Sequence, residues 1–326
     1  MRAALLALLL AAVPAAAQVP PPPVQKIVTA VDPLTIELDD FRRLADPEIW
    51  RDLQVRRIEF REGRTFWRLY RIANTRRPDG PLWLVPHDNE NAAFQAAVYA
   101  ARSYGGVVMA VEEARSLAGP DSRGNGDVAA GGDVDPNRNF RPDTPDFAGA
   151  MLADLGNPAR LSVALHTNDP GYDAAGSSCL PPESGEETGK GTISVLLCND
   201  LYMPRRSIAG RWPFDDTDSV AIVSYLGERS PFSGFCARPL SDADFNIMFE
   251  HVVTSDGSAS NFAVFRGLPY VNLETQERGV APDQLGEARS RLLAMIDTVM
   301  ARCAVIPRLS LDLPEPHERP RRRRGR

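Results

Sequence analysis

Short apolar runs alternate with a helical pattern along the middle of the chain. The runs over 81–86, 106–112 and 161–165 are continuous and apolar, which is typical of strands buried on both faces. Between the first two, 91–104 carries apolar residues at helical spacing and ends at Gly105, so it predicts a helix. This recurring order predicts an α/β fold with a mixed, largely parallel sheet and helices on both faces.

Shorter patterns predict the remaining elements. Thr144, as a capping residue, and Pro145, in the first turn, predict the start of a helix that runs to Leu155, and the final helix is expected over 283–301. The other strands that the pattern predicts are 54–60 and 65–72, with a hairpin turn at 61–64 between them, then 192–197, 220–225 and 270–273.

The first residues have the pattern of a secretory signal peptide. Arg2 precedes an apolar run over 3–13, and small residues follow up to Ala17, so a signal peptide over 1–17 is expected. The run is too short to cross a bilayer, which takes about 20 residues. We therefore expect an exported protein, periplasmic or extracellular, with no transmembrane segment.

The rest of the chain divides into three parts. A Pro-rich segment is expected over 18–45, a single domain over 46–310 and a disordered basic tail over 311–326. The whole chain has a formal net charge of −6, although six arginines lie in its last eight residues. A tether to anionic envelope components is the alternative to simple disorder for this tail. We expect a monomer without a nucleic-acid partner.

The four cysteines form an even set, which in an exported chain suggests two disulfides with three pairings open. Cys179–Cys198 would close the Gly- and Ser-rich loop between them, and Cys236–Cys303 would hold the last helix. Because there is no Cys-x-x-Cys pair, a thiolate metal site is not favoured.

Polar residues follow three of the predicted strands. His87 and Glu90 come after the first apolar run, His166 comes directly after the third, and Glu274 follows the strand that ends at residue 273. Ligand sites in such sheets lie beyond the carboxyl ends of the strands, so these groups are expected at one edge. Two His and one Glu commonly hold catalytic zinc, and a further carboxylate is needed to take a proton from water. The sequence therefore predicts a metal-dependent hydrolytic site.

The segment Asp133-Val-Asp-Pro-Asn-Arg-Asn-Phe140 narrows this prediction. With the His87 motif, His166 and Glu274, it resembles the zinc carboxypeptidases of the M14 family, whose order is His-x-x-Glu, Asp-x-Asn-Arg-Asn with an aromatic, a third ligand His and a late Glu. The resemblance covers about residues 80 to 280 and implies a divergent, exported bacterial member. It implies one Zn²⁺ per chain, bound by His87, Glu90 and His166, and Glu274 as general base.

The same resemblance implies four further roles. Asn137 and Arg138 would bind the terminal carboxylate of a substrate, a task suited to the guanidinium fork. Asp135 would accept a hydrogen bond from His87 and orient it. Arg123 is the nearest candidate for the family's oxyanion-stabilising arginine. No tyrosine stands in 252–260, where the family has its substrate-capping tyrosine.

Three functions remain open at this point. The first is an exported zinc amide hydrolase that cleaves a peptide bond near a free carboxylate, with peptidoglycan stem peptides as substrates. The segment Leu165-His-Thr-Asn168 is similar to the aspartoacylase and succinylglutamate desuccinylase branch, which implies the second, N-deacylation of small acyl amino acids. The third is a non-catalytic module that binds peptide termini, although such a module is not expected to keep Glu274.

Overall fold

The computed structural model describes residues 24–112, 123–168, 177–178 and 192–309. The predicted signal peptide, the basic tail and Cys179 lie outside these residues. Among the described helices, none is long and apolar enough to cross a membrane.

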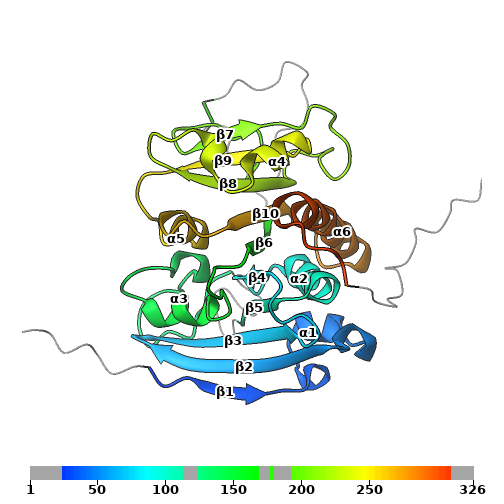
Figure 1. Ribbon diagram of the computed structural model, residues 1–326. Coiled ribbons are helices and arrows are strands. Elements are labelled where there is room, and N and C mark those ends of the chain that lie inside the picture. Colours follow the sequence, from blue (N-terminus) through cyan, green and yellow to red (C-terminus); the bar gives the residue numbers. More distant parts are fainter. Residues whose placement is uncertain (1–23, 113–122, 169–176, 179–191, 310–326) are drawn as a thin grey trace, which may run out of the picture.

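Within the described residues, ten strands form one sheet in the order β1-β2-β3-β5-β4-β6-β10-β8-β9-β7 (Figure 1). Their bounds are β1 Ile27–Ala30, β2 Leu53–Glu62, β3 Thr65–Asn74, β4 Leu82–Val85, β5 Val107–Glu112, β6 Ser162–Asn168, β7 Tyr202–Arg205, β8 Val220–Leu226, β9 Ile247–Val252 and β10 Tyr270–Gln276.

The predicted mixed sheet is confirmed, and its parallel part lies where the site was expected. The central strands β5, β4, β6 and β10 are parallel to one another. Strands β1, β2 and β3 join one side of this centre by antiparallel pairing, and β8 joins the other side antiparallel to β10. Beyond β8, β9 pairs in parallel and β7 closes the edge antiparallel. Four of these nine pairs are parallel, so the parallel character belongs mainly to the centre.

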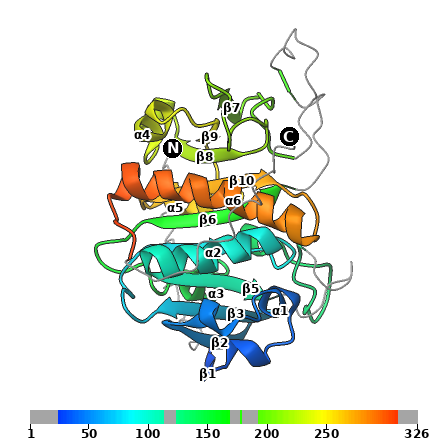
Figure 2. The same cartoon turned by 90° about the vertical axis from the view of Figure 1, so that its right-hand side faces the viewer.

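Helices cover both faces of the sheet, as the pattern predicted. Helices α2 and α6 lie on one face and α3 and α5 on the other, and Figure 2 shows α2 and α6 in front of the sheet, running roughly along its strands. Two large apolar clusters fill the two layers. The helix bounds are α1 Asp39–Arg43, α2 Asn91–Tyr104, α3 Pro145–Met151, α4 Ala237–Asp242, α5 Ala259–Phe265 and α6 Pro282–Val299, with one π-helical turn, η6 Met300–Ala304, after α6.

Two predicted elements differ from the structure. The segment 192–197 is not a strand, because Val195 N donates to Thr217 O and Leu197 N turns back to Ser194 O. Its apolar side chains instead pack on β8 and β9 as a small separate cluster. The apolar residues of this segment are therefore buried because a loop packs on the sheet, and they do not belong to a strand.

The predicted helix from Thr144 is shorter than expected and is capped differently. The Thr144 hydroxyl donates to Asn139 O at 2.6 Å and so does not cap α3. The Glu62 carboxylate of β2 accepts from Asp146 N and Phe147 N instead, at 2.7 and 3.1 Å. The helix ends at Met151 rather than Leu155, because the next N–H groups bond over three residues, Ala153 N to Ala150 O and Leu155 N to Leu152 O. The chain then turns at Gly156, with φ of 78°.

One of the two favoured disulfides is present among the described residues. Cys236 at the start of α4 is bonded to Cys303 in η6, with the two Cα atoms 5.5 Å apart. This bond ties the end of the last helix to the part of the chain between β8 and β9. The pairing of Cys179 with Cys198 stays a prediction.

Candidate active site

The carboxyl ends of three neighbouring parallel strands meet at the site. Strand β6 lies between β4 and β10, and His166 is directly opposite Glu274 in the register of β6 and β10. His87 comes two residues after the end of β4. His166 and Glu274 do not follow their strands as predicted but lie within them, because β6 runs on to Asn168 and β10 to Gln276. Since the strands are parallel, side chains near their carboxyl ends reach the same edge of the sheet, although they are far apart in the sequence.

A single carboxylate connects the two histidines. Glu90 stands at the N-terminal boundary of α2, and its Oε1 lies 2.7 Å from His87 Nδ1 while its Oε2 lies 2.9 Å from His166 Nδ1. The backbone N–H of Thr167 also donates to Oε2, at 3.2 Å. All three side chains are almost fully buried.

These three residues fit a zinc site. One ligand atom from each can be chosen so that all lie within 4.8 Å of one another. Two imidazole nitrogens and a carboxylate oxygen form a donor set typical of catalytic zinc, and they leave a further position for water or substrate. His166 Nε2 is moreover buried without a hydrogen-bond partner among the described residues. The arrangement is therefore suited to a metal ion, and zinc matches its donor set.

Asp135 and Arg123 lie against these residues. His87 Nε2 is 3.0 Å from Asp135 Oδ1, the contact expected of a carboxylate that orients a metal-binding imidazole. Arg123 is partly exposed, with Nη1 3.3 Å from Glu90 Oε1 and Nε 3.5 Å from Asp135 Oδ2. The sequence reasoning found no fixed spacing for Arg123, but the fold places it at the site.

The charges of this cluster stabilise one another. Burial by itself raises the pKa of Glu90, yet the imidazoles of His166 and His87 outweigh it and hold this pKa below its ordinary value. Burial likewise raises the pKa of Asp135, but the hydrogen bond and charge of His87 and the charge of Arg123 lower it to about 2. For His87, burial lowers the pKa, and the carboxylates of Glu90 and Asp135 more than reverse that effect.

Glu274 has the environment of a proton acceptor. It is 8% exposed, and its Oε1 accepts a hydrogen bond from Asn272 Nδ2 at 2.9 Å. Burial, assisted by the charge of Glu90, raises the pKa of Glu274 above its ordinary value despite the opposing effect of His166. A raised carboxyl pKa favours proton transfer near neutral pH.

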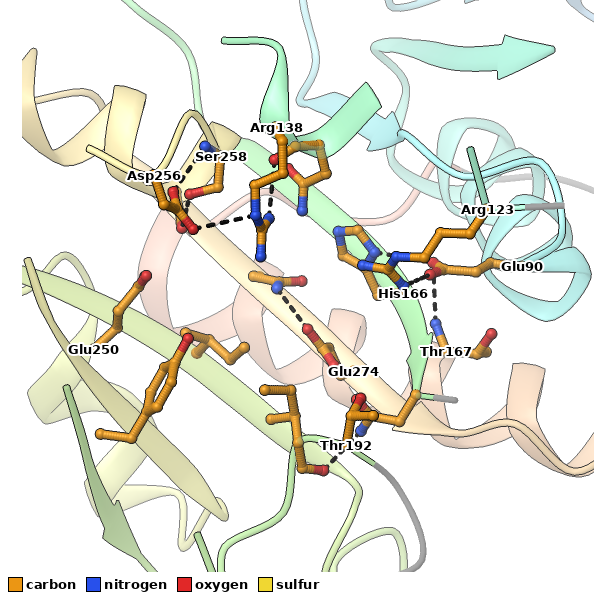
Figure 3. Close-up of a pocket in the computed structure, with 17 residues that line it drawn as sticks. Glu90, Arg123, Arg138, His166, Thr167, Thr192, Glu250, Asp256, Ser258 and Glu274 are labelled. Carbon is orange, nitrogen blue, oxygen red and sulfur yellow. Dashed lines mark hydrogen bonds and ion pairs between the residues drawn. The ribbon is translucent and has the colours of Figure 1, made fainter. Parts of the chain in front are cut away.

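A cavity of about 230 Å³ joins these groups to the predicted carboxylate-binding pair. Figure 3 shows Glu274, His166 and Arg138 among the side chains that line this cavity. Asn137 and Arg138 belong to the short helical turn η3 Pro136–Arg138. Asn137 Oδ1 accepts from Ala259 N at the start of α5, whereas Arg138 Nε lies 3.4 Å from Asp256 Oδ2.

Three residues that line the cavity were missed by the sequence reasoning. Tyr202 of β7 and Glu250 of β9 are opposite each other in an antiparallel pair, and Asn272 precedes Glu274 by two positions in β10. A polar residue inside a buried apolar strand is a usable signal for Glu250 and Asn272. Tyr202 had no such signal, since β7 is short and isolated in the sequence. It gives the cavity a tyrosine from an element other than 252–260.

Besides His166, the segment 165–168 contains Asn168, which has a structural role. Asn168 is buried, and its side-chain amide donates to Ile193 O and Asp218 O. It thereby holds the loop that includes Thr192, another residue at the cavity, against β6. Asn168, one of the residues that make this segment similar to the deacylase branch, thus has a structural role in the cavity wall.

No protein-family model matches the sequence, and neither does any curated protein. Among solved structures, the chain is similar to the cell shape determinant protein Csd4 from Helicobacter pylori, with 11% identity and a TM-score of 0.41, over 70% of this chain and 51% of that one. The chain thus spans about half the length of Csd4.

Two further solved structures are similar. The succinylglutamate desuccinylase from Chromobacterium violaceum is 13% identical, with a TM-score of 0.38, over 80% of this chain and 70% of that one. A candidate metallopeptidase from Shewanella denitrificans is 14% identical, with a TM-score of 0.40, over 89% of this chain and all of that one. At such identities the function has to be inferred from the site itself.

The site predicts near-stoichiometric zinc binding that depends on His87 and His166. Replacing either histidine with alanine removes a ligand, so we expect the bound zinc to be lost from the purified protein. Asp135→Asn should keep one zinc per chain but weaken its affinity about 10- to 100-fold. Elemental analysis and competition with a chromophoric chelator measure both effects.

His251→Ala is the matched control, because His251 stacks on Tyr225 and bonds to Gly227 O, away from the cluster. Undiminished zinc in both His87→Ala and His166→Ala would contradict the assignment.

Proposed function

We propose that this chain is a zinc-dependent amide hydrolase of the metallocarboxypeptidase type, which cleaves an amide bond next to a free carboxylate. The observation that carries the proposal is the pairing of His166 with Glu274 in adjacent parallel strands, at a cavity that Arg138 also lines. A ligand set, a proton acceptor and a carboxylate-binding cation are thereby combined in one cavity.

Each group has a role in this reaction. Zinc held by His87, Glu90 and His166 would polarise a carbonyl group and make water more acidic. Glu274 takes a proton from the attacking water and later delivers it to the leaving amine, for which its raised pKa is suited. Asn272 donates to Glu274 and so fixes the carboxylate that moves the proton.

Arg138 and Asn137 bind the carboxylate of the substrate. The ion pair of Arg138 with Asp256 is about half exposed on both sides, and such pairs contribute little stability. A substrate carboxylate can therefore bind the guanidinium without a large loss. The contact of Asn137 Oδ1 with Ala259 N leaves the NH₂ end of the amide as the donor for the same carboxylate.

Arg123 is the residue we assign to the carbonyl oxygen. Its guanidinium lies beside Glu90 and lines the cavity, so it can stabilise negative charge that develops on that oxygen. The nearby carboxylates of Glu90 and Asp135 hold it in place.

The finer proposal is an exported monomer that acts on peptides, with peptidoglycan stem peptides as its substrates. The leader pattern over 1–17 supports export, and so does the Cys236–Cys303 bond, because disulfides persist mainly in oxidising compartments. Stem peptides are an envelope amide with free carboxylates. N-deacylation of small acyl amino acids uses the same residues and is the alternative that substrate tests must separate.

Replacing the proton acceptor should abolish turnover without removing the metal. We expect Glu274→Gln to keep its zinc and to lower kcat about 100- to 10,000-fold, since general base catalysis contributes that much. Muropeptide, peptide and N-acyl amino acid pools, incubated with wild type and variant and compared by mass spectrometry, show which class is consumed.

A pool consumed equally by both proteins would contradict the role of Glu274. Consumption of the N-acyl amino acids alone would favour the deacylase alternative.

Removing the guanidinium should abolish the preference for a free carboxylate. Wild type is expected to cleave a peptide with a free C-terminal carboxylate in preference to the same peptide with a C-terminal amide. In Arg138→Ala this preference should fall about 10- to 100-fold, mainly through KM for the free acid, because a charge-assisted hydrogen bond is lost. An unchanged ratio of kcat/KM values for the two peptides in the variant would contradict this assignment.

A further inference from the structure

The far wall of the cavity is formed by strands that take no part in the zinc cluster. Tyr202 of β7 is opposite Glu250 of β9, and Glu250 is opposite Ser224 of β8. Residues in register on neighbouring strands project from the same face of a sheet, so these three side chains form one row. In Figure 3, Glu250 lies on the side of the cavity away from Glu90 and Arg123.

Glu250 is a buried acid with neutral partners. It is 8% exposed, and it accepts from the Ser224 hydroxyl at 2.5 Å and from Asn261 Nδ2 at 2.7 Å. Within the described part of the chain, no arginine, lysine or histidine forms an ion pair with it. Burial raises the pKa of Glu250, and the nearby carboxylate of Asp256 adds to that effect. A buried carboxylate without a positive partner is costly to the fold.

The side chain of Asn272, at the same cavity, has an acceptor that no described residue satisfies. Asn272 Oδ1 is buried without a hydrogen-bond partner among the described residues, although Nδ2 of the same amide donates to Glu274. Reversing this amide would turn its oxygen towards the Glu274 carboxylate, so the contact with Glu274 fixes the orientation. The cavity therefore presents a carboxylate and an amide oxygen that can both receive donors.

The two cations at the cavity are already engaged elsewhere. Arg138 lies beside Asp256, and Arg123 lies beside Glu90 and Asp135. Neither compensates Glu250. A ligand that enters the cavity can supply the positive charge that Glu250 lacks, and a primary ammonium, with three donors and no acceptor, suits a wall of acceptors.

We propose that Glu250 binds a primary ammonium at the end of the side chain that belongs to the substrate's carboxylate-bearing residue. This inference rests on the proposed function and adds a substrate class to it: amides whose leaving amino acid is of the lysine type. Glu274, the proposed proton acceptor, lies on β10, and β9, which carries Glu250, lies two strand spacings away, about 10 Å. An ammonium at the end of a long side chain can span this distance better than an α-ammonium.

The test uses two probes that differ in the ammonium. N-benzoylglycyl-lysine and N-benzoylglycyl-norleucine have the same four-carbon stem and the same free carboxylate, but only lysine carries the nitrogen. Zinc-loaded wild type should hydrolyse the lysine probe with kcat/KM about tenfold or more above that of the norleucine probe. In Glu250→Gln the ratio should fall to about one, through loss of the lysine rate alone. Glu228→Gln, an exposed acid of the turn after β8, is the matched control and should keep the wild-type ratio.

A binding measurement separates this inference from the proposed function. Zinc-loaded Glu274→Gln, titrated calorimetrically with lysine and with norleucine, should bind lysine about tenfold or more tightly, and the added Glu250→Gln change should remove the difference. Hydrolysis of both probes at equal rates by wild type would overturn the ammonium inference and leave the hydrolase standing. If neither probe is hydrolysed, the titration decides: tighter lysine binding that depends on Glu250 supports the inference, and equal binding overturns it.

Discussion

The carboxylate of Glu90 is the group on which the site depends. It is completely surrounded by protein, where an isolated negative charge would be strongly unfavourable, and it is stabilised by partners from separate parts of the chain. His87 comes from the end of β4, His166 from β6, and Arg123 from a loop. Because Glu90 also begins α2, the helix fixes its direction. The parallel pairing of β4 with β6 therefore determines whether the cluster can form at all.

Two regions of the sheet contribute different groups to the site. The parallel centre of the sheet carries the candidate metal ligands and the proposed proton acceptor, since adjacent parallel strands end at the same edge. Strands β8, β9 and β7 extend the sheet past β10 and supply a polar wall with Tyr202 and Glu250. In the proposed hydrolase, reaction chemistry and substrate selection would thus come from different strands. A change in β7 or β9 could alter selectivity while His166 and Glu274 stay in register.

The sequence predicted an element best where a single physical cause, such as burial on both faces, determines the pattern of its residues. Continuous apolar runs predicted the buried strands β4, β5 and β6, and helical spacing predicted α2 with the bounds that the structure has. The residues of the candidate metal site could be placed at one edge because strand ends fix their positions. The segment 192–197 was misread because burial beneath a loop gives the same pattern as a strand. Glu250 and Tyr202 could not be assigned to the cavity, since that requires the pairing of two residues 48 positions apart in the sequence, 250 minus 202.

Zinc bound between His87, Glu90 and His166 is the central claim, and anomalous X-ray scattering at the zinc edge tests it most directly. Crystals of the protein purified with zinc should show one anomalous peak in contact with all three side chains, beside the cavity that contains Glu274. Such a peak should be absent from crystals of His166→Ala grown in the same way. A wild-type crystal whose zinc lies away from these residues, with their hydrogen bonds to Glu90 intact, would contradict the account.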